Sequence, residues 1–220
     1  MSEVFSWIVG ATETNISDDT LCRVTAYEGL GMAPLHRLSE RAPLQNGITD
    51  RGYRLDPREI ILQVAFWDTS EDDFHDKRTT LLNLFKPRST AGTLKFVRGS
   101  TTRHIDCHYV GGIQFPADGR GRWIQKTPVA LLCPDPRWYD PTINTVTFNI
   151  GGGANTFVVP FEVPFTVGAS TIDLDRTITY DGSVMSYPTI RITGPIEDCV
   201  ITNNSTGYKL DFTGTTIAAD

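Results

Sequence analysis

Apolar and polar residues alternate along several stretches of this chain, which is the pattern of β-strands with one buried face. The clearest alternation covers residues 55–67. Every second position in its centre is large and apolar: Ile60, Leu62, Val64 and Phe66. Residues 92–97 and 101–110 predict a hairpin about Arg98-Gly99-Ser100, and residues 122–133 predict another long strand. Most of the first part of the chain is therefore expected to be β-sheet.

One helix is predicted directly after the first of these strands. Ser70 suits an N-cap, and the acidic residues 71–73 suit the positive end of a helix dipole. The apolar positions then recur near helical spacing: Phe74, Leu81, Leu82 and Phe85. Pro87 is expected to end the helix.

Residues 26–57 have a different character, because they are rich in Gly, Pro, Arg and acidic residues and hold few long apolar runs. A segment of this length is long for a passive connection within a compact domain. We therefore predict a functional segment. An ordinary surface loop is the alternative.

A domain boundary is predicted near residue 140, where residues 134–141 contain three prolines. Residues 1–140 form the first predicted domain and residues 141–220 the second. Short β-rich stretches separated by Gly-rich or Asp-rich turns predict a β-sandwich in the second domain: 145–150, 156–161, 171–179, 189–193, 199–201 and 208–212. About 80 residues is short for such a sandwich, so an incomplete domain is an open alternative.

The net charge of −6 is unevenly distributed. Residues 1–140 carry 17 Lys and Arg against 18 Asp and Glu, whereas residues 141–220 carry 3 against 8. Neither part has the basic character of a protein that grips nucleic acid. If DNA is involved, we expect it only to pass by.

The sequence also predicts where the protein is made. Its start lacks a secretion signal, and no apolar stretch is long enough for a membrane span, so we expect a soluble protein made in the cytoplasm.

The four cysteines are far apart and follow no zinc or disulfide spacing. We expect buried free thiols at Cys22, Cys107, Cys133 and Cys199.

Catalytic and ligand-binding chemistry finds little support. In the segment 104–108, His104, Asp106 and His108 would share one face of a strand while Cys107 points away, so a four-ligand metal site is not expected. The carboxylate pairs 72–73 and 173–175 have structural explanations, and no nucleophile elbow, phosphate loop or zinc-protease motif occurs. We expect no enzyme, no cofactor and no metal. Core packing is the default for the aromatic candidates Trp123, Trp138 and Tyr139, with sugar stacking as the alternative.

An ordered set of short motifs is more specific than these features. In chain order it comprises Tyr-Glu-Gly-Leu-Gly at 27–31, residues 38–47, residues 52–60, Leu-Phe-Lys-Pro at 84–87 and Leu-Cys-Pro-Asp-Pro-Arg-Trp-Tyr at 132–139. This order resembles the distal tail protein family of long-tailed bacteriophages, the siphovirus tail-component proteins. The resemblance covers residues 20–141 well.

The resemblance implies a mainly β fold with an N-terminal split β-barrel, similar to tail-tube proteins, and one flanking α-helix. A galectin-like β-sandwich would follow. Such proteins form a hexameric ring at the tail tip that joins the tail tube to the tail hub or tail-associated protein, and DNA passes through the ring. The tape measure protein and a receptor-binding protein are further candidate partners, and the expected location is the virion tail tip.

A ring subunit needs polar surfaces that its neighbours satisfy. The predicted ring or partner interface comprises Arg37, Glu40, Arg41, Asp50, Arg51, Arg54 and Arg58. Trp138 and Tyr139 are predicted to pack between the two domains. Open alternatives are another β-barrel tail part such as a tube or hub protein, and a carbohydrate-binding module. A cell-wall hydrolase would need a convergent acid and base, and no convincing pair occurs.

Overall fold

The long alternating stretches form the longest strand pair in the main sheet. The computed structural model describes residues 3–111, 113–116, 120–121, 123–147, 175 and 177–218. In it, β6 (Arg58–Trp67) and β10 (Ile124–Cys133) pair antiparallel over ten residues each. Both strands bury alternate side chains over most of their length, so the strands predicted at 55–67 and 122–133 are confirmed.

The predicted hairpin is also present. β7 (Gly92–Arg98) and β8 (Thr101–Tyr109) pair antiparallel, with Arg98 opposite Thr101. Gly99 lies in the connecting turn with a φ of 61°, a conformation that glycine adopts without steric cost. The turn therefore falls where the sequence predicted it.

Three further strands come from the start of the chain, where the pattern gave no prediction. They are β1 (Glu3–Val9), β2 (Thr12–Asn15) and β3 (Arg23–Glu28). The strand order is β2-β1-β7-β8-β10-β6-β3, and the short β9 (Arg120–Gly121) pairs with β10 off this path. The chain's first residues thus supply both outer strands of the sheet.

Ile16 links the two ends of this sheet. Its N–H donates to the carbonyl oxygen of Phe5 in β1 at 2.9 Å, and its own carbonyl accepts the N–H of Val24 in β3 at 3.1 Å. Ile16 is fully buried. The sheet is therefore curled into a barrel-like form whose strand ladder does not close, and the predicted mainly β fold class is confirmed in this form.

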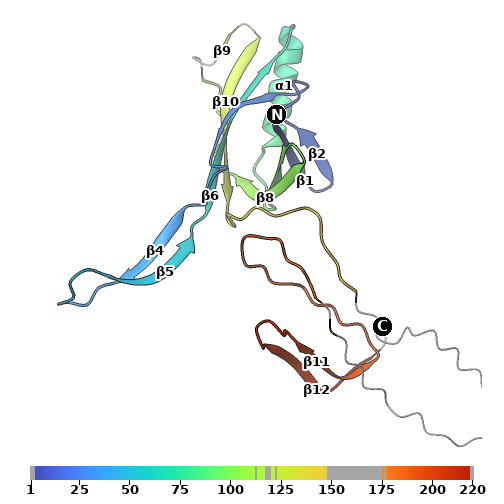
Figure 1. Ribbon diagram of the computed structural model, residues 1–220. Helices are drawn as coiled ribbons and strands as arrows, with labels where there is room; N and C mark the ends of the chain where they lie inside the picture. The colour runs from blue at the N-terminus through green and yellow to red at the C-terminus, as the bar shows by residue number, and fades with distance from the viewer. Residues whose placement is uncertain are drawn as a thin grey trace, which may run out of the picture. The chain divides into compact units, whose positions relative to one another are not determined.

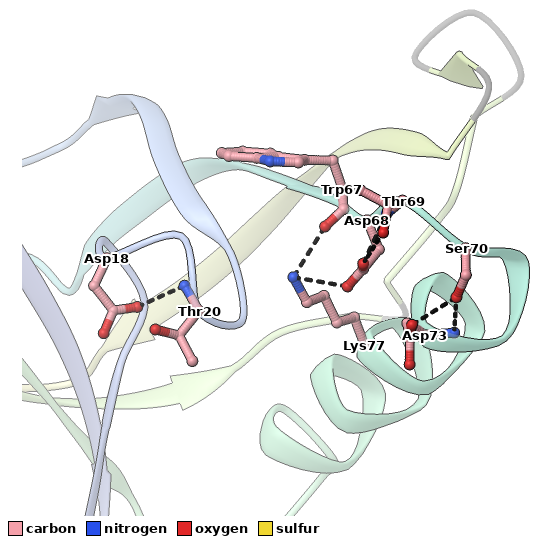
Figure 2. Close-up of polar contacts among 8 residues, drawn as sticks. All are labelled: Asp18, Thr20, Trp67, Asp68, Thr69, Ser70, Asp73 and Lys77. Atoms are coloured by element: carbon pink, nitrogen blue, oxygen red, sulfur yellow. Dashed lines mark hydrogen bonds and ion pairs between the residues drawn. The ribbon is translucent and has the colours of Figure 1, made fainter.

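The predicted helix, α1 (Glu71–Leu84), packs beside the sheet (Figure 1). The Ser70 hydroxyl oxygen accepts the N–H of Asp73 at 3.2 Å, as expected for an N-cap (Figure 2). Farther along, the Lys77 ammonium donates to the carbonyl oxygen of Trp67 at 2.9 Å and pairs with Asp68 at 3.1 Å. These contacts fix the turn between β6 and the helix.

The apolar face of the helix is narrower than predicted. Phe74 and Leu81 are buried in the core, together with Phe85 just after the helix. Leu82, predicted for the same face, is 43% exposed. It lies one position from Leu81 and so points about 100° away around the helix axis.

The segment predicted as functional is not a loop throughout. After β3 it forms a hairpin of β4 (Leu35–Glu40) and β5 (Thr49–Leu55), which among the described residues pair only with each other (Figure 1). Every residue of the two strands is exposed except the half-buried Gly52. We call this hairpin the arm.

The chain forms two compact units, Met1–Thr145 and Val146–Asp220. In the second unit, β11 (Ile196–Thr202) and β12 (Lys209–Ile217) form an antiparallel pair that includes the strands predicted at 199–201 and overlaps the one at 208–212. The strand predicted at 189–193 is wrong, because these residues pair with no other strand in the described part of the chain. The strand predicted at 156–161 lies outside the described residues, as do residues 148–150 and residues 171–174 and 176 of the strands predicted at 145–150 and 171–179; the described residues of these two stretches are not in strands. The nature of the second domain stays a prediction.

Candidate assembly interface

The arm is attached to the barrel by a close approach of two backbones. Gly29 lies just after β3 with a φ of +84°, and a Cβ there would come within 2.1 Å of the Glu59 carbonyl oxygen in β6. Only glycine fits this combination of conformation and space. The arm strands follow from this point, and the Asp56 N–H closes their base by donating to the Pro34 carbonyl oxygen at 2.9 Å.

Arg58, one of the predicted interface residues, belongs to this attachment. It is only 4% exposed, and its Nη1 donates to the carbonyl oxygen of Gly29 at 3.2 Å. Burial lowers the pKa of the Arg58 guanidinium from its ordinary value. Arg58 thus braces the base of the arm and does not present its charge at the surface.

The other six predicted interface residues lie together on the arm. Two ion pairs cross it, Arg37 with Asp50 at 3.0 Å and Arg51 with Glu40 at 2.6 Å. All four side chains are more than 60% exposed. Exposed pairs of this kind contribute less than about 1 kcal/mol each, so they do little to hold the arm in one conformation.

Arg41 and Arg54 lie at opposite ends of the arm. The Nε of Arg41 donates to the carbonyl oxygen of Gln45 at 3.4 Å in the tip, whereas the Nε of Arg54 pairs with Asp56 at 3.2 Å near the base. Charged side chains are therefore present from the base of the arm to its tip. The structure brings these residues together, and their role as an interface stays a prediction.

The arm also carries apolar side chains that sequence reasoning missed. Leu35 and Leu55 are directly opposite each other in the two strands, at 44% and 38% exposure. Tyr53, two residues before Leu55, shares their face and is 61% exposed. The alternation of Tyr53 and Leu55 was the available signal, but the dense charges around it concealed the pattern.

Trp138 and Tyr139 both pack within the first unit. The Trp138 ring lies 6.3 Å from the ring of Phe96. Tyr139 exchanges two backbone hydrogen bonds with His104, at 2.8 and 2.9 Å, and its hydroxyl donates to Asp106 at 2.8 Å. These contacts hold the segment after β10 against the barrel. The predicted packing between domains stays a prediction.

The candidate metal ligands at 104–108 and the candidate sugar-stacking aromatic residues lie at separate positions in the fold. Cys107 and Ile105 point into the core while Asp106 is exposed, so the 104–108 strand divides its polar groups as expected. Among the described residues no group of three His, Cys, Asp or Glu side chains is placed to hold a metal ion. Trp123 packs near Phe74, and Trp138 packs elsewhere on the core, so the aromatic candidates form no common platform.

The cysteines largely follow expectation. Cys22, Cys107 and Cys133 are buried free thiols, whereas Cys199 in β11 is only half-buried. Burial, with Asp18 nearby, raises the pKa of Cys22 to about 12. Such a thiol is inert at neutral pH. Within the described part of the chain, no helix is both long and apolar enough to cross a bilayer.

The first unit thus combines a curled β-sheet, one flanking helix and a charged hairpin. Residues 30–133 match the family model described as the phage tail protein RIFT-related domain. The resemblance to siphovirus tail-component proteins is thereby confirmed, and the location is the virion tail. A comparison with curated proteins finds no match.

Similar solved structures also come from phage tails. The Dit protein of phage SPP1, described as a paradigm of the hub adsorption apparatus in phages that infect Gram-positive hosts, matches at 18% identity with a TM-score of 0.49. The match covers 63% of this chain and 53% of that one. A chain of the phage p2 baseplate in its activated conformation with strontium matches at 7% identity and a TM-score of 0.49, covering 60% of this chain and 44% of that one. The present chain thus spans about half the length of these proteins.

Proposed function

We propose that this chain is a structural protein of the phage tail tip that assembles into a hexameric ring and joins the tail tube to the tail hub or fibre. The family match supports a tail role, and the arm is the observation that carries the assembly. The role is structural and not catalytic. The tape measure protein and a receptor-binding protein are further partners in this proposal.

The arm's exposure is the physical argument for assembly. A two-stranded hairpin with no further support is marginally stable in water. The arm's strands pair only with each other, so each presents an outer edge of unpaired backbone groups. A neighbouring subunit that covers Leu35, Leu55 and Tyr53 would bury apolar area and order the hairpin at once.

The charges of the arm suit a repeated interface. Arginines and carboxylates alternate across it, so identical copies can form opposite-charge contacts in a closed ring. Residues 1–140 are close to neutral overall. A ring with a near-neutral lumen lets DNA slide, because few phosphate contacts oppose its movement.

The second domain is proposed to be a galectin-like β-sandwich on the outside of the ring. The support is the resemblance of the first domain and the β-pair of β11 and β12. A peripheral domain of this kind would attach a receptor-binding or other baseplate protein. Sugar binding by the isolated chain would instead favour a carbohydrate-binding module.

The test is the mass of the purified chain by light scattering across concentration and salt. A species of six copies supports the ring. The informative variant is the double exchange of Glu40→Arg with Arg51→Glu, which keeps an ion pair within the arm but reverses the charges that a neighbour meets. We expect it to lower the association constant of each subunit contact about tenfold, which corresponds to about 1.4 kcal/mol for each contact, and so to shift the hexamer to higher protein concentration.

The matched control is the exchange of Glu13→Lys with Lys95→Glu, a pair of the barrel surface at 2.9 Å. It should leave the hexamer intact. A chain that stays monomeric at high concentration, even with purified tail tube or hub protein added, would contradict the proposal. An exchange in the arm that leaves the hexamer unchanged would show that the arm is not the contact.

A further inference from the structure

Two buried thiols lie next to each other where β8 pairs with β10. Cys107 in β8 and Cys133 in β10 are both fully buried, and their sulfur atoms lie 3.0 Å apart. Both are free. The sequence gives no hint of this pair, because 26 residues separate the two cysteines.

The strand register suits a disulfide at this place. Leu131 lies opposite Tyr109 and Leu132 opposite His108, so the next step of the same register places Cys133 opposite Cys107. Directly opposite residues of antiparallel strands have Cα atoms about 4.5 to 5.5 Å apart. A disulfide spans about 4.4 to 6.8 Å between Cα atoms, and the sulfurs need to approach by about 1 Å to bond. The bond can therefore form without any change of register.

A buried positive charge lies beside one of the thiols. Arg58 in β6 is directly opposite Cys133 in the ladder, and its Nε has no hydrogen-bond partner in the described structure. The hydrogen bond from Cys107 and the charge of Arg58 lower the pKa of Cys133, against the effect of burial. The same hydrogen bond, with burial, raises the pKa of Cys107. Because the Arg58 charge lies opposite Cys133 in the ladder, we take Cys133 as the sulfur that reacts first.

A small oxidant can approach one sulfur of the pair. Cys107 lines a cavity of about 60 Å³, together with Phe85, Gly92 and Trp7. This volume admits a molecule of the size of hydrogen peroxide. Cys133 does not line the cavity, but its sulfur lies 3.0 Å from the sulfur of Cys107.

We propose that Cys107 and Cys133 are an oxidisable pair that hydrogen peroxide converts to a disulfide across β8 and β10. The Cys133 thiolate attacks one peroxide oxygen, the O–O bond breaks, and the leaving hydroxide takes up a proton to become water. Cys107 then loses its proton and attacks the Cys133 sulfur, and the S–O bond breaks to release a second water. Two thiols lose two electrons, and one peroxide is reduced to two waters.

The bond would strengthen a short pairing in the sheet. β8 pairs with β10 through two residue pairs in the ladder, whereas β6 pairs with β10 through ten. A phage protein is made in a reducing cytoplasm and later works in virions outside the cell, where no thiol pool keeps it reduced. The bond would form after the fold is complete, and it does not depend on assembly into a ring.

The test treats the folded full-length chain with hydrogen peroxide, then denatures it and alkylates the remaining thiols. We expect the four reactive thiols of the wild type to fall to two, with a mass loss of about 2 Da before alkylation. Peptide mapping should find Cys107 joined to Cys133, and dithiothreitol should restore both thiols. The oxidised chain should melt at a higher temperature than the reduced chain.

A matched variant isolates the pair. Cys22→Ser with Cys199→Ser leaves only these two thiols, which should disappear together; the wild-type thiol count decides the question if this variant does not fold. In Arg58→Gln, which removes the charge, the pH profile of the reaction should move to higher pH, a result that a loss of packing alone would not give. Oxygen addition at a single cysteine, linkage to Cys22 or Cys199, or no reaction in the folded chain would overturn the proposal.

Discussion

The guanidinium carbon of Arg58 lies 5.8 Å from the centre of the Trp138 ring. This contact joins the first residue of β6 to the segment that follows β10, in a buried position where a cation over an indole ring stabilises both groups. Because Arg58 also binds the carbonyl oxygen of Gly29, one side chain connects the arm's base, the central sheet and the closing segment.

Replacing Trp138 by Ala should destabilise the first unit by about 2 kcal/mol, because it removes a partly buried ring from Phe96 and Arg58. Trp138→Phe keeps a ring over the guanidinium and should cost less than half as much. Urea unfolding followed by circular dichroism measures both. An alanine variant as stable as the wild type would show that the contact with Arg58 does not contribute to the unfolding free energy.

Gly29→Ala should destabilise the chain by at least about 2 kcal/mol, since the new Cβ would meet the Glu59 carbonyl oxygen and the backbone would keep an unfavourable φ. Gly31→Ala is the matched control, because a Cβ at Gly31 meets nothing within 4 Å. The thermal midpoint of the control should stay near the wild-type value. Equal effects of the two substitutions would contradict the close approach at Gly29.

Ser70→Ala should lower the unfolding free energy by about 1 kcal/mol, the usual effect of losing an N-cap acceptor. The Ser70 hydroxyl accepts the N–H of Asp73, which has no partner earlier in the helix. The exposed Ser89 provides a control of the same chemistry, and Ser89→Ala should be silent. Chemical denaturation of the three proteins side by side makes the comparison.

The elements that the sequence predicted well are those whose signals are local. The alternation of apolar and polar residues predicts β6 and β10. The N-cap, the acidic first turn and the proline after the helix predict α1. The strands at the start of the chain lack such signals. Phe5, Ser6 and Trp7 of β1 are buried in succession, a pattern that neither an alternating strand nor a helix gives.

The misjudged residues depend on contacts between distant parts of the chain. Arg58 follows a proline and precedes a glutamate, so the sequence suggests a charged surface position like the other arginines of the segment. Its burial arises only when Gly29 and Trp138 come together around it. Ile16 is similar, because its central place between β1 and β3 depends on the strand order and not on its neighbours in sequence.

Stability in acid should report on Asp68, which joins the end of β6 to the helix. The N–H of Thr69 and then the Lys77 ammonium hold the pKa of Asp68 below its ordinary value. A carboxyl with a lowered pKa in the folded state stabilises the fold above the pKa of the unfolded chain, about 3.9, and loses that effect as the pH falls through the folded value.

The thermal midpoint of Asp68→Asn should therefore lie below the wild-type midpoint at pH 7, and the difference should shrink below about pH 4. The exposed Asp76 on the same helix gives the control, because Asp76→Asn should leave the thermal midpoint at pH 7 near the wild-type value. A constant gap between Asp68→Asn and the wild type from pH 7 to pH 3 would mean that the Asp68 charge does not contribute.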